Sequence, residues 1–267
     1  MPWDSKNHFY PMFRFLGASL ANGEVPLWNP YHFGGHPSIS DPQSLIFTPT
    51  LLAFAWLAPN ASMQTFDLII LGHLFMGGLG MVGLAWRRGW RPAAAVLSAI
   101  VFMLGGSAAA RLQHTGIIIS YSWFPLAFWA LEAAMDRPGW RAGALFGMLA
   151  GLMALGRDQV AFLFCAMFLS LVVWNAVRSG APLVWLRKRL PTLLSAAIVG
   201  AAILVVPSLL TMQFLGASNR PGIAYGVAAA GSLAPVNLIT LIAPNFFGSL
   251  SWGYDYWGPG YETVTEP

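Results

Sequence analysis

Six uncharged, mostly apolar runs fill the middle of the chain. They cover residues 68–86, 92–110, 112–131, 142–156, 159–177 and 190–219. Most of these runs approach the roughly 20 residues that a helix needs to cross a bilayer. Inside a bilayer only helices and closed barrels satisfy every backbone hydrogen bond, and these runs lack the period-2 alternation of barrel strands. The runs therefore predict an all-α, polytopic helical membrane protein.

The composition supports this class. Charged residues make up 9% of the chain, whereas about a quarter of the residues in a soluble domain are charged. The mean hydropathy is +0.61. The pI of ≈ 9.5 could suggest a nucleic-acid partner, but the basic residues lie between the apolar runs, so we expect none. The single cysteine, Cys165, excludes an intrachain disulfide, and we interpret it as a small residue facing lipid or the core.

We expect one transmembrane domain over residues 1–267. It has an outer segment at 1–65, about six spanning helices within 66–212, and a second outer region at 213–267. The apolar stretch "PTLLAFAWLAP" (49–59) has only nine residues between its two prolines, or about 14 Å of helix. Because this is too short to cross a ~30 Å core, we expect a helix in the outer interface.

The basic residues indicate the orientation. Three short connections, 87–91, 136–141 and 178–189, hold nine of the fourteen Lys and Arg. These are Arg87, Arg88, Arg91, Arg137, Arg141, Arg178, Arg187, Lys188 and Arg189. By the positive-inside rule the three connections are cytoplasmic.

Most acids and histidines then fall on the outer face. They are Asp4, His8, Glu24, His32, His36, Asp41, His114, Asp158, Asp255, Glu262 and Glu266. Glu132 and Asp136 lie on the cytoplasmic side, Asp67 near the outer boundary, and His73 a turn or two into the membrane. We therefore expect any chemistry on the extracytoplasmic face.

The first outer segment combines a helix with a rigid loop. Residues 7–22 predict a short amphipathic helix with Phe9, Phe13 and Leu16 or Leu20 on one face. The stretch "PLWNPYHFGGHPSISDPQS" (26–44) follows, and its prolines and glycines favour a turned loop. The aromatic residues of this loop suit either anchoring in the interface or stacking on a sugar. They are Trp28, Tyr31 and Phe33.

An ordered set of motifs resembles the bacterial YfhO-like membrane proteins, which belong to the GT-C class of glycosyltransferases. The first motif is "D…FYPMFRFLGASLANGEVPLWNPYHFGGHPSISDPQSLIFTP", which begins at Asp4. It is followed by "QHTGIIISYSWFPLAFWALEAA" (113–134), "GRDQVAFLF" (156–164), "PSLLTMQFLGASNRP" (207–221) and "APNFFG…YWGPGYE" (243–262). The resemblance covers nearly all of this chain but only the N-terminal part of a family member. It implies a GT-C-like fold with interfacial helices in the first outer loop.

Two departures from the family concern the ends of the sequence. Members have a transmembrane helix before the Asp loop, and further helices after the region matched here. The start "MPWDSKNHFYP" is polar and carries no secretory signal. We therefore expect either a piece of a longer protein or a misassigned start, and we expect such a piece to be inactive alone.

The resemblance implies a function at the outer face of the bacterial cytoplasmic (inner) membrane. A sugar would pass from a polyprenyl-phosphate-linked donor to a hydroxyl of an envelope glycan or lipid acceptor. Such a reaction needs a carboxylate to take the acceptor's proton, cationic groups for the leaving phosphate, and a groove for the lipid tail.

Two carboxylates are the catalytic candidates. Asp4 matches the family's acid in the first outer loop, although an acid before a helix also suits a capping role. Asp41 is the second candidate, and as a residue before Pro42 it also suits a turn. The remaining candidates are substrate-binding residues. They are Arg111, His114, Arg157, Asp158, Gln159, Arg220, Trp28, Asn29, His32, His36 and Glu262.

Some of these candidates have alternatives. Arg111 and His114 stand three apart at the outer end of a predicted helix, so we expect them to share a face. Arg157 and Asp158 replace a Gly-His-Pro-Gln-like turn of relatives and would also suit a turn salt bridge. The outer histidines raise the alternative of a divalent metal, but the glycines and proline around His32 and His36 argue against a helix that would align them. We expect no cofactor.

Two other function classes remain open. A lipid or small-molecule transporter or flippase would place ionisable residues near the midplane, often on broken helices in repeated halves. The runs are clean except for His73, and no repeat is visible. A membrane scaffold without catalysis would leave the acids and arginines of the outer face unexplained.

Overall fold

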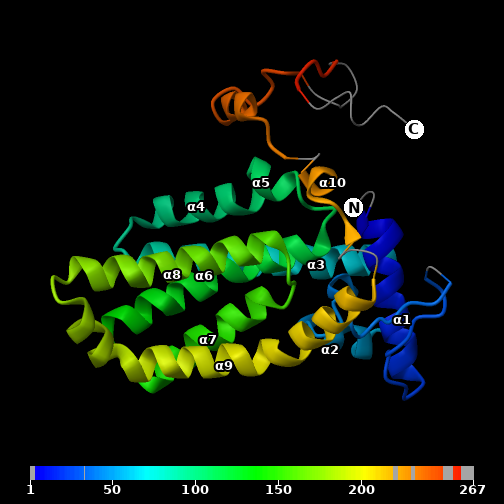
Figure 1. Cartoon of the computed structure of the whole chain (residues 1–267), viewed down its shortest axis with the longest axis horizontal. Coiled ribbons are helices and arrows are strands. Elements are labelled where there is room, and N and C mark those ends of the chain that lie inside the picture. Colours follow the sequence, from blue (N-terminus) through cyan, green and yellow to red (C-terminus); the bar gives the residue numbers. More distant parts are fainter. Residues whose placement is uncertain (1–3, 33, 219–221, 230–231, 249–254, 260–267) are drawn as a thin grey trace. The chain divides into compact units, whose positions relative to one another are not determined.

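The computed structural model describes residues 4–32, 34–218, 222–229, 232–248 and 255–259 (Figure 1). Over these residues the secondary structure is helical, apart from one isolated antiparallel bridge between Asn29 and His36. The prediction of an all-α protein is confirmed to this extent. The chain forms two compact units, Met1–Phe214 and Leu215–Pro267, and each is treated separately.

Within the described residues, five helices are long and apolar enough to cross a membrane. They are α3 (Met63–Arg87), α4 with α5 (Pro92–Ala109), α6 (Thr115–Asp136), α8 (Gln159–Arg178) and α9 (Pro182–Ala217). The sixth apolar helix, α7 (Trp140–Ala154), has 15 residues. These helices indicate a multi-pass membrane protein.

Helix α6 lies at the centre of the first unit. It packs against α3, α7 and α8, and α3 also packs against α4 (Pro92–Leu104) (Figure 1). Stacked rings fill the contact between α6 and α8: the ring centroid of Phe124 lies 4.1 Å from that of Phe164 and 5.7 Å from that of Phe168. Aromatic side chains therefore join the two helices.

Glycines bring α7 close to α9. Gly143 and Gly147 are four residues apart on α7, and the backbone of α9 lies directly against them at Thr192 and Ala196. The N–H of Gly139, just before α7, also donates to the Thr192 hydroxyl at 2.7 Å. Small residues at this spacing let two membrane helices approach closely, so a glycine contact joins this pair.

The described residues of 4–65, called the first outer segment after their predicted side, lie against one end of the bundle. A five-residue π-helix (Ser5–Phe9) leads into α1 (Tyr10–Ala21), which runs across the direction of α3 in Figure 1. The predicted helix over 7–22 is confirmed, and its Phe9, Phe13 and Leu16 are buried in one cluster with Phe66 of α3.

Helix α2 is as short as the two prolines imply. It covers Pro49–Leu57, nine residues, and α3 begins only at Met63. Residues 45–65 therefore do not form one long helix. That α1 and α2 lie in the membrane interface stays a prediction.

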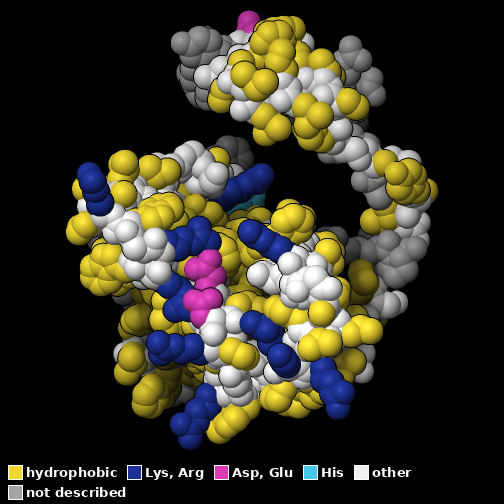
Figure 2. All heavy atoms as spheres, turned by 90° about the vertical axis from the view of Figure 1, so that its left-hand side faces the viewer, with side chains coloured by type: hydrophobic (Ala, Val, Ile, Leu, Met, Phe, Trp, Pro, Cys, Tyr) yellow, Lys and Arg dark blue, Asp and Glu magenta, His cyan; other side chains and the backbone are white. Residues whose placement is uncertain are grey.

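The helix connections gather at two opposite ends of the bundle. One end, called the histidine end, holds Asp4, His114 and the turn at Arg157. The basic end holds the connections of α3 to α4, α6 to α7 and α8 to α9, and Figure 2 shows its Lys and Arg side chains around a small acidic group. Ion pairs from Arg87 to Asp136 and from Arg88 to Glu132 join two of these connections.

One boundary at the basic end differs from the prediction. The basic stretch 187–189 was expected in a connection between spanning segments, but α9 already begins at Pro182. Proline suits the first turn of a helix because the N–H it lacks would have no partner there. Arg187, Lys188 and Arg189 therefore lie on the first turns of α9.

The described part of the second unit includes two short helices. They are α10 (Tyr225–Ala229) and the 3-10 helix Pro235–Leu241. Phe247 and Trp257 also contact each other, with ring centroids 5.0 Å apart and the backbone N–H of Trp257 donating to the Phe247 carbonyl at 2.9 Å.

Candidate functional site

Asp4 lies at the start of the first outer segment, beside the connection between α5 (Gly106–Ala109) and α6. It immediately precedes the π-helix, and its side chain is 54% exposed. Its Oδ2 lies 3.6 Å from Nε2 of His114, the residue just before α6. The other ring nitrogen of His114, Nδ1, is buried with no hydrogen-bond partner among the described residues. An accessible carboxylate and a histidine thus meet at the histidine end.

The predicted helical spacing of Arg111 and His114 is wrong. Helix α4 ends at Leu104, Gly105 is extended, and α5 ends at Ala109. Arg111 and His114 instead close a turn, in which the His114 N–H donates to the Arg111 carbonyl at 2.8 Å. Gly105 favours the break between α4 and α5, because a glycine backbone adopts conformations that a helix does not allow. The Arg111 side chain is exposed.

Three histidines form a row beside Asp41. The His8 and His32 ring centroids lie 5.3 Å apart, and those of His32 and His36 lie 5.7 Å apart. His36 Nε2 lies 2.9 Å from Asp41 Oδ2. The charges of Asp41 and Asp4 both raise the pKa of His8, so both candidate carboxylates lie near this histidine.

Asp41 holds the loop together. It is 7% exposed, and its Oδ1 accepts from the Gln43 N–H at 2.8 Å at the start of the 3-10 helix Pro42–Ser44. The Ser44 hydroxyl donates to the Asp41 carbonyl at 2.8 Å. With Oδ2 turned to His36, this carboxylate forms the turn that its position before a proline predicts, and it is far less accessible than Asp4.

Arg157 connects three distant segments. Its Nη1 donates to the Pro207 carbonyl at 2.9 Å and to the Thr211 hydroxyl at 2.8 Å, and its Nη2 donates to the Asp41 carbonyl at 3.4 Å. Thr211 in turn donates to the Ser40 carbonyl at 3.1 Å. Burial lowers the pKa of Arg157 to about 10, partly opposed by the charge of Asp41, so the guanidinium stays charged at neutral pH.

The backbone at Arg157 is unusual for a residue with a side chain. Its φ is 52°, in the left-handed region where non-glycine residues are uncommon and cost on the order of 1–3 kcal/mol. The contacts of the side chain to α9 and to the first outer segment hold it there.

Asp158 and Gln159 have local roles. Asp158 Oδ1 accepts from the N–H groups of Val160 and Ala161, both at 2.9 Å, which caps α8. Its Oδ2 accepts from the Ser120 hydroxyl at 2.5 Å. The alternative of a turn salt bridge between Arg157 and Asp158 is wrong, because the two side chains bind different partners. Gln159 is exposed at the first position of α8.

The remaining candidates divide by position. Asn29 is buried; its backbone pairs with that of His36, and its Oδ1 accepts from the Tyr31 N–H at 3.0 Å. Trp28 and Tyr31 are 56% and 88% exposed, so their rings are free to contact lipid or a sugar. Arg220 and Glu262 lie outside the described residues, as does Phe33.

His8 is the site residue that the sequence candidates missed. It follows Asp4 by four positions, a spacing that places both near one helix face and could have marked it. Its Nε2 is buried without a hydrogen-bond partner in the described part of the chain. Burial lowers the pKa of His8, Asp41 and Asp4 oppose this shift, and His32 and His36 add to it.

This pKa shift predicts sensitivity to acid. A histidine whose folded pKa lies below its unfolded value of 6.5 binds fewer protons when folded, so stability is present above pH 6.5 and is lost as the pH falls below it. The slope is at most about 1.4 kcal/mol per pH unit for one group. We expect the unfolding midpoint of His8→Gln to fall less than that of wild type between pH 7.5 and 5. The exposed neighbour Lys6→Gln should keep the pH dependence of wild type. Parallel curves for wild type and His8→Gln would contradict the assignment.

No three His, Cys, Asp or Glu side chains among the described residues are placed to hold a metal ion together. Searches against protein-family models, curated proteins and solved structures find no match to the chain.

Proposed function

We propose that the chain is a membrane glycosyltransferase of the GT-C class, related to the YfhO-like proteins. It would move a sugar from a polyprenyl-phosphate donor to a hydroxyl acceptor at the outer face of the bacterial cytoplasmic membrane. The observation that carries the proposal is the exposed Asp4 carboxylate beside His114, within a cluster at the end of the bundle opposite the basic loops. A general base must be accessible to its substrate, and Asp4 is.

In the proposed step the acceptor's hydroxyl oxygen attacks the anomeric carbon of the donor sugar. The bond from that carbon to the phosphate oxygen breaks, and polyprenyl phosphate leaves with the bonding electrons. Asp4 takes the acceptor's proton as the new bond forms. His114 Nε2 lies 3.6 Å from the carboxylate and would help to orient it.

The leaving phosphate needs a cation. Arg157 is already bound to α9 and the first outer segment, so its role in the proposal is to hold the site together. Arg111 is exposed and lies in the same turn as His114. We therefore assign the phosphate to Arg111, because a cation stabilises the negative charge that develops on the leaving group in the transition state.

The transporter alternative would require an ionisable group deep in the bundle that is available to a substrate. His73 of α3 is the candidate. Its Nε2 lies 2.6 Å from the Thr50 hydroxyl and its Nδ1 lies 2.8 Å from the Ile69 carbonyl, so both ring nitrogens are occupied within the protein. This pairing favours a structural role for His73.

The orientation is tested by cysteine accessibility. In a Cys165→Ala background, cysteines replacing exposed Glu24 or Ala110 at the histidine end should react with a membrane-impermeant maleimide in intact cells. Cysteines replacing exposed Arg91 or Ala181 at the basic end should react only after the membrane is permeabilised, because the basic connections are expected to be cytoplasmic. The reverse pattern would rule out an outward-facing site.

A further inference from the structure

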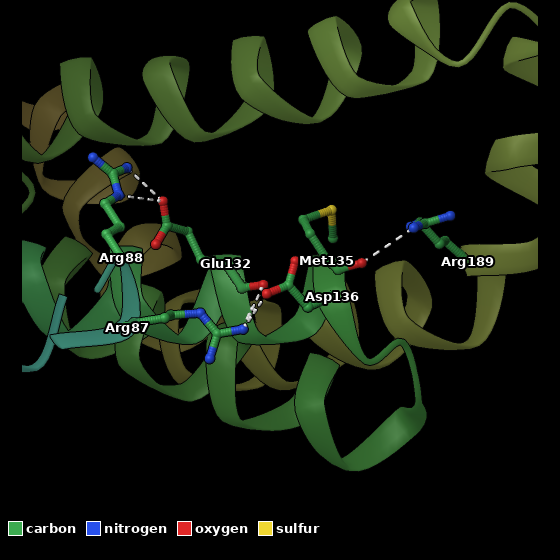
Figure 3. A network of polar contacts seen from close by, with 6 residues as sticks. All are labelled: Arg87, Arg88, Glu132, Met135, Asp136 and Arg189. Carbon is green, nitrogen blue, oxygen red and sulfur yellow. Dashed lines mark hydrogen bonds and ion pairs between the residues drawn. The ribbon is translucent and has the colours of Figure 1, made fainter. Parts of the chain in front are cut away.

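A cavity opens at the basic end, between the ends of α3, α6 and α8. It measures about 350 Å³, within the range of ligand pockets. Its polar side is formed by Arg87, Arg88, Glu132 and Asp136, which Figure 3 shows as two facing pairs. Its apolar side includes Phe128 and Leu171, which lie about two turns inside the ends of α6 and α8. One wall is thus charged and the other suits hydrocarbon.

The two arginines keep hydrogen-bond donors to spare. Arg87 donates through Nη2 to Asp136 Oδ2 at 2.5 Å and to the Glu132 carbonyl at 3.3 Å, and Arg88 donates through Nε and Nη2 to Glu132 Oε1. A guanidinium has five N–H donors. Among the described residues no acceptor engages the others. The carboxylates therefore fix both guanidinium groups without using up their capacity for a phosphate.

The surroundings of the cavity favour an anion. Nine Lys and Arg belong to the basic end, and among its described residues only Glu132 and Asp136 are acidic. Figure 2 shows this excess of basic side chains around the acidic group. The Arg88 guanidinium also lies over the Phe128 ring, 5.3 Å from its centroid, which places the cation at the junction of the polar and apolar walls.

We propose that this cavity binds the phosphate of an anionic glycerophospholipid. Arg87 and Arg88 would hold the phosphodiester, and the acyl chains would leave along Phe128 and Leu171 toward the bilayer. A soluble phosphate compound would use the charged wall and leave the apolar wall uncovered. Basic pockets between membrane helices bind anionic head groups in this manner. The bound lipid would join the ends of α3, α6 and α8, independently of any reaction at the histidine end.

The test compares lipids by their effect on unfolding. The full-length protein in neutral detergent is heated with phosphatidylglycerol, with phosphatidylcholine, or with glycerol 3-phosphate. We expect phosphatidylglycerol to raise the unfolding midpoint by several degrees, and the other two compounds to leave it within error. Equal shifts with both lipids, or the full shift with glycerol 3-phosphate, would overturn the proposal.

Variants locate the site. The double variant Arg88→Gln with Glu132→Gln removes one ion pair, leaves neither partner unpaired and keeps the net charge. We expect phosphatidylglycerol no longer to raise the unfolding midpoint of this variant. Arg91→Gln removes an exposed cation at the same end, outside the cavity lining, and we expect it to keep most of the shift. Each shift is measured from the variant's own lipid-free midpoint, so a change in basal stability does not obscure the result. A full shift in the double variant, or loss in Arg91→Gln alone, would place the lipid elsewhere.

Discussion

Asp4→Asn is expected to lower sugar transfer by about 10²–10⁴-fold while leaving the abundance of the protein unchanged. The substitution keeps the size of the side chain and removes its basicity. A loss of about 10²–10⁴-fold in rate is usual when a general base is removed. The side chain is 54% exposed and makes no cap hydrogen bond, so the fold does not depend on it. The rate of transfer in membranes, normalised to protein level, measures the effect.

Two matched variants accompany this measurement. Glu24→Gln replaces an exposed carboxylate of the same outer segment and should be silent. Asp41→Asn should reduce the amount of folded protein, because Asp41 is 7% exposed and binds both His36 and the Gln43 N–H. If Asp41→Asn is well folded and inactive while Asp4→Asn is active, Asp41 is the base and our assignment is wrong.

Arg157→Met is expected to give the largest loss of stability among the site variants. The guanidinium joins the turn before α8 to Pro207 and Thr211 of α9 and to Asp41 of the first outer segment. One hydrogen bond to a charged group contributes about 1.5–3 kcal/mol, and the variant loses more than one of them. We expect the unfolding midpoint to fall by several degrees and transfer to fall with it.

Arg111→Met is the control for Arg157. It removes an exposed arginine at the same end of the bundle, so it should leave the unfolding midpoint unchanged and reduce transfer only. Equal stability of Arg157→Met and wild type would show that the contacts between these three segments do not hold the site together.

The helices were predictable because their signals are local. Uncharged runs marked the spanning helices, and the prolines around α2 marked it as short. One helix boundary at the basic end was not predicted, because α9 begins at Pro182, before the basic stretch. The ion pairs of Glu132 and Asp136 with Arg88 and Arg87 were not predicted either, because the paired residues are 44 and 49 positions apart in the sequence.

The contacts among the candidate residues could not be predicted from the sequence. Asp4 and His114 are separated by 110 positions, and Arg157 and the Asp41 carbonyl by 116. Contacts over such separations follow from the packing of α1 and α9, which no local pattern encodes. The different roles of Asp4 and Asp41 also depend on burial, and the two carboxylates look alike in the sequence.

Transfer of label from a lipid-linked sugar tests the proposed glycosyltransferase activity itself. Membranes containing the full-length protein are supplied with radiolabelled polyprenyl-phosphate sugars, and label is followed into envelope glycan or lipid. We expect label to move to a hydroxyl acceptor with wild-type protein, and to stay on the donor with Asp4→Asn or without the protein. If wild-type membranes transfer no more label than membranes lacking the protein, with every polyprenyl-phosphate sugar supplied, the chain is not a glycosyltransferase of this class.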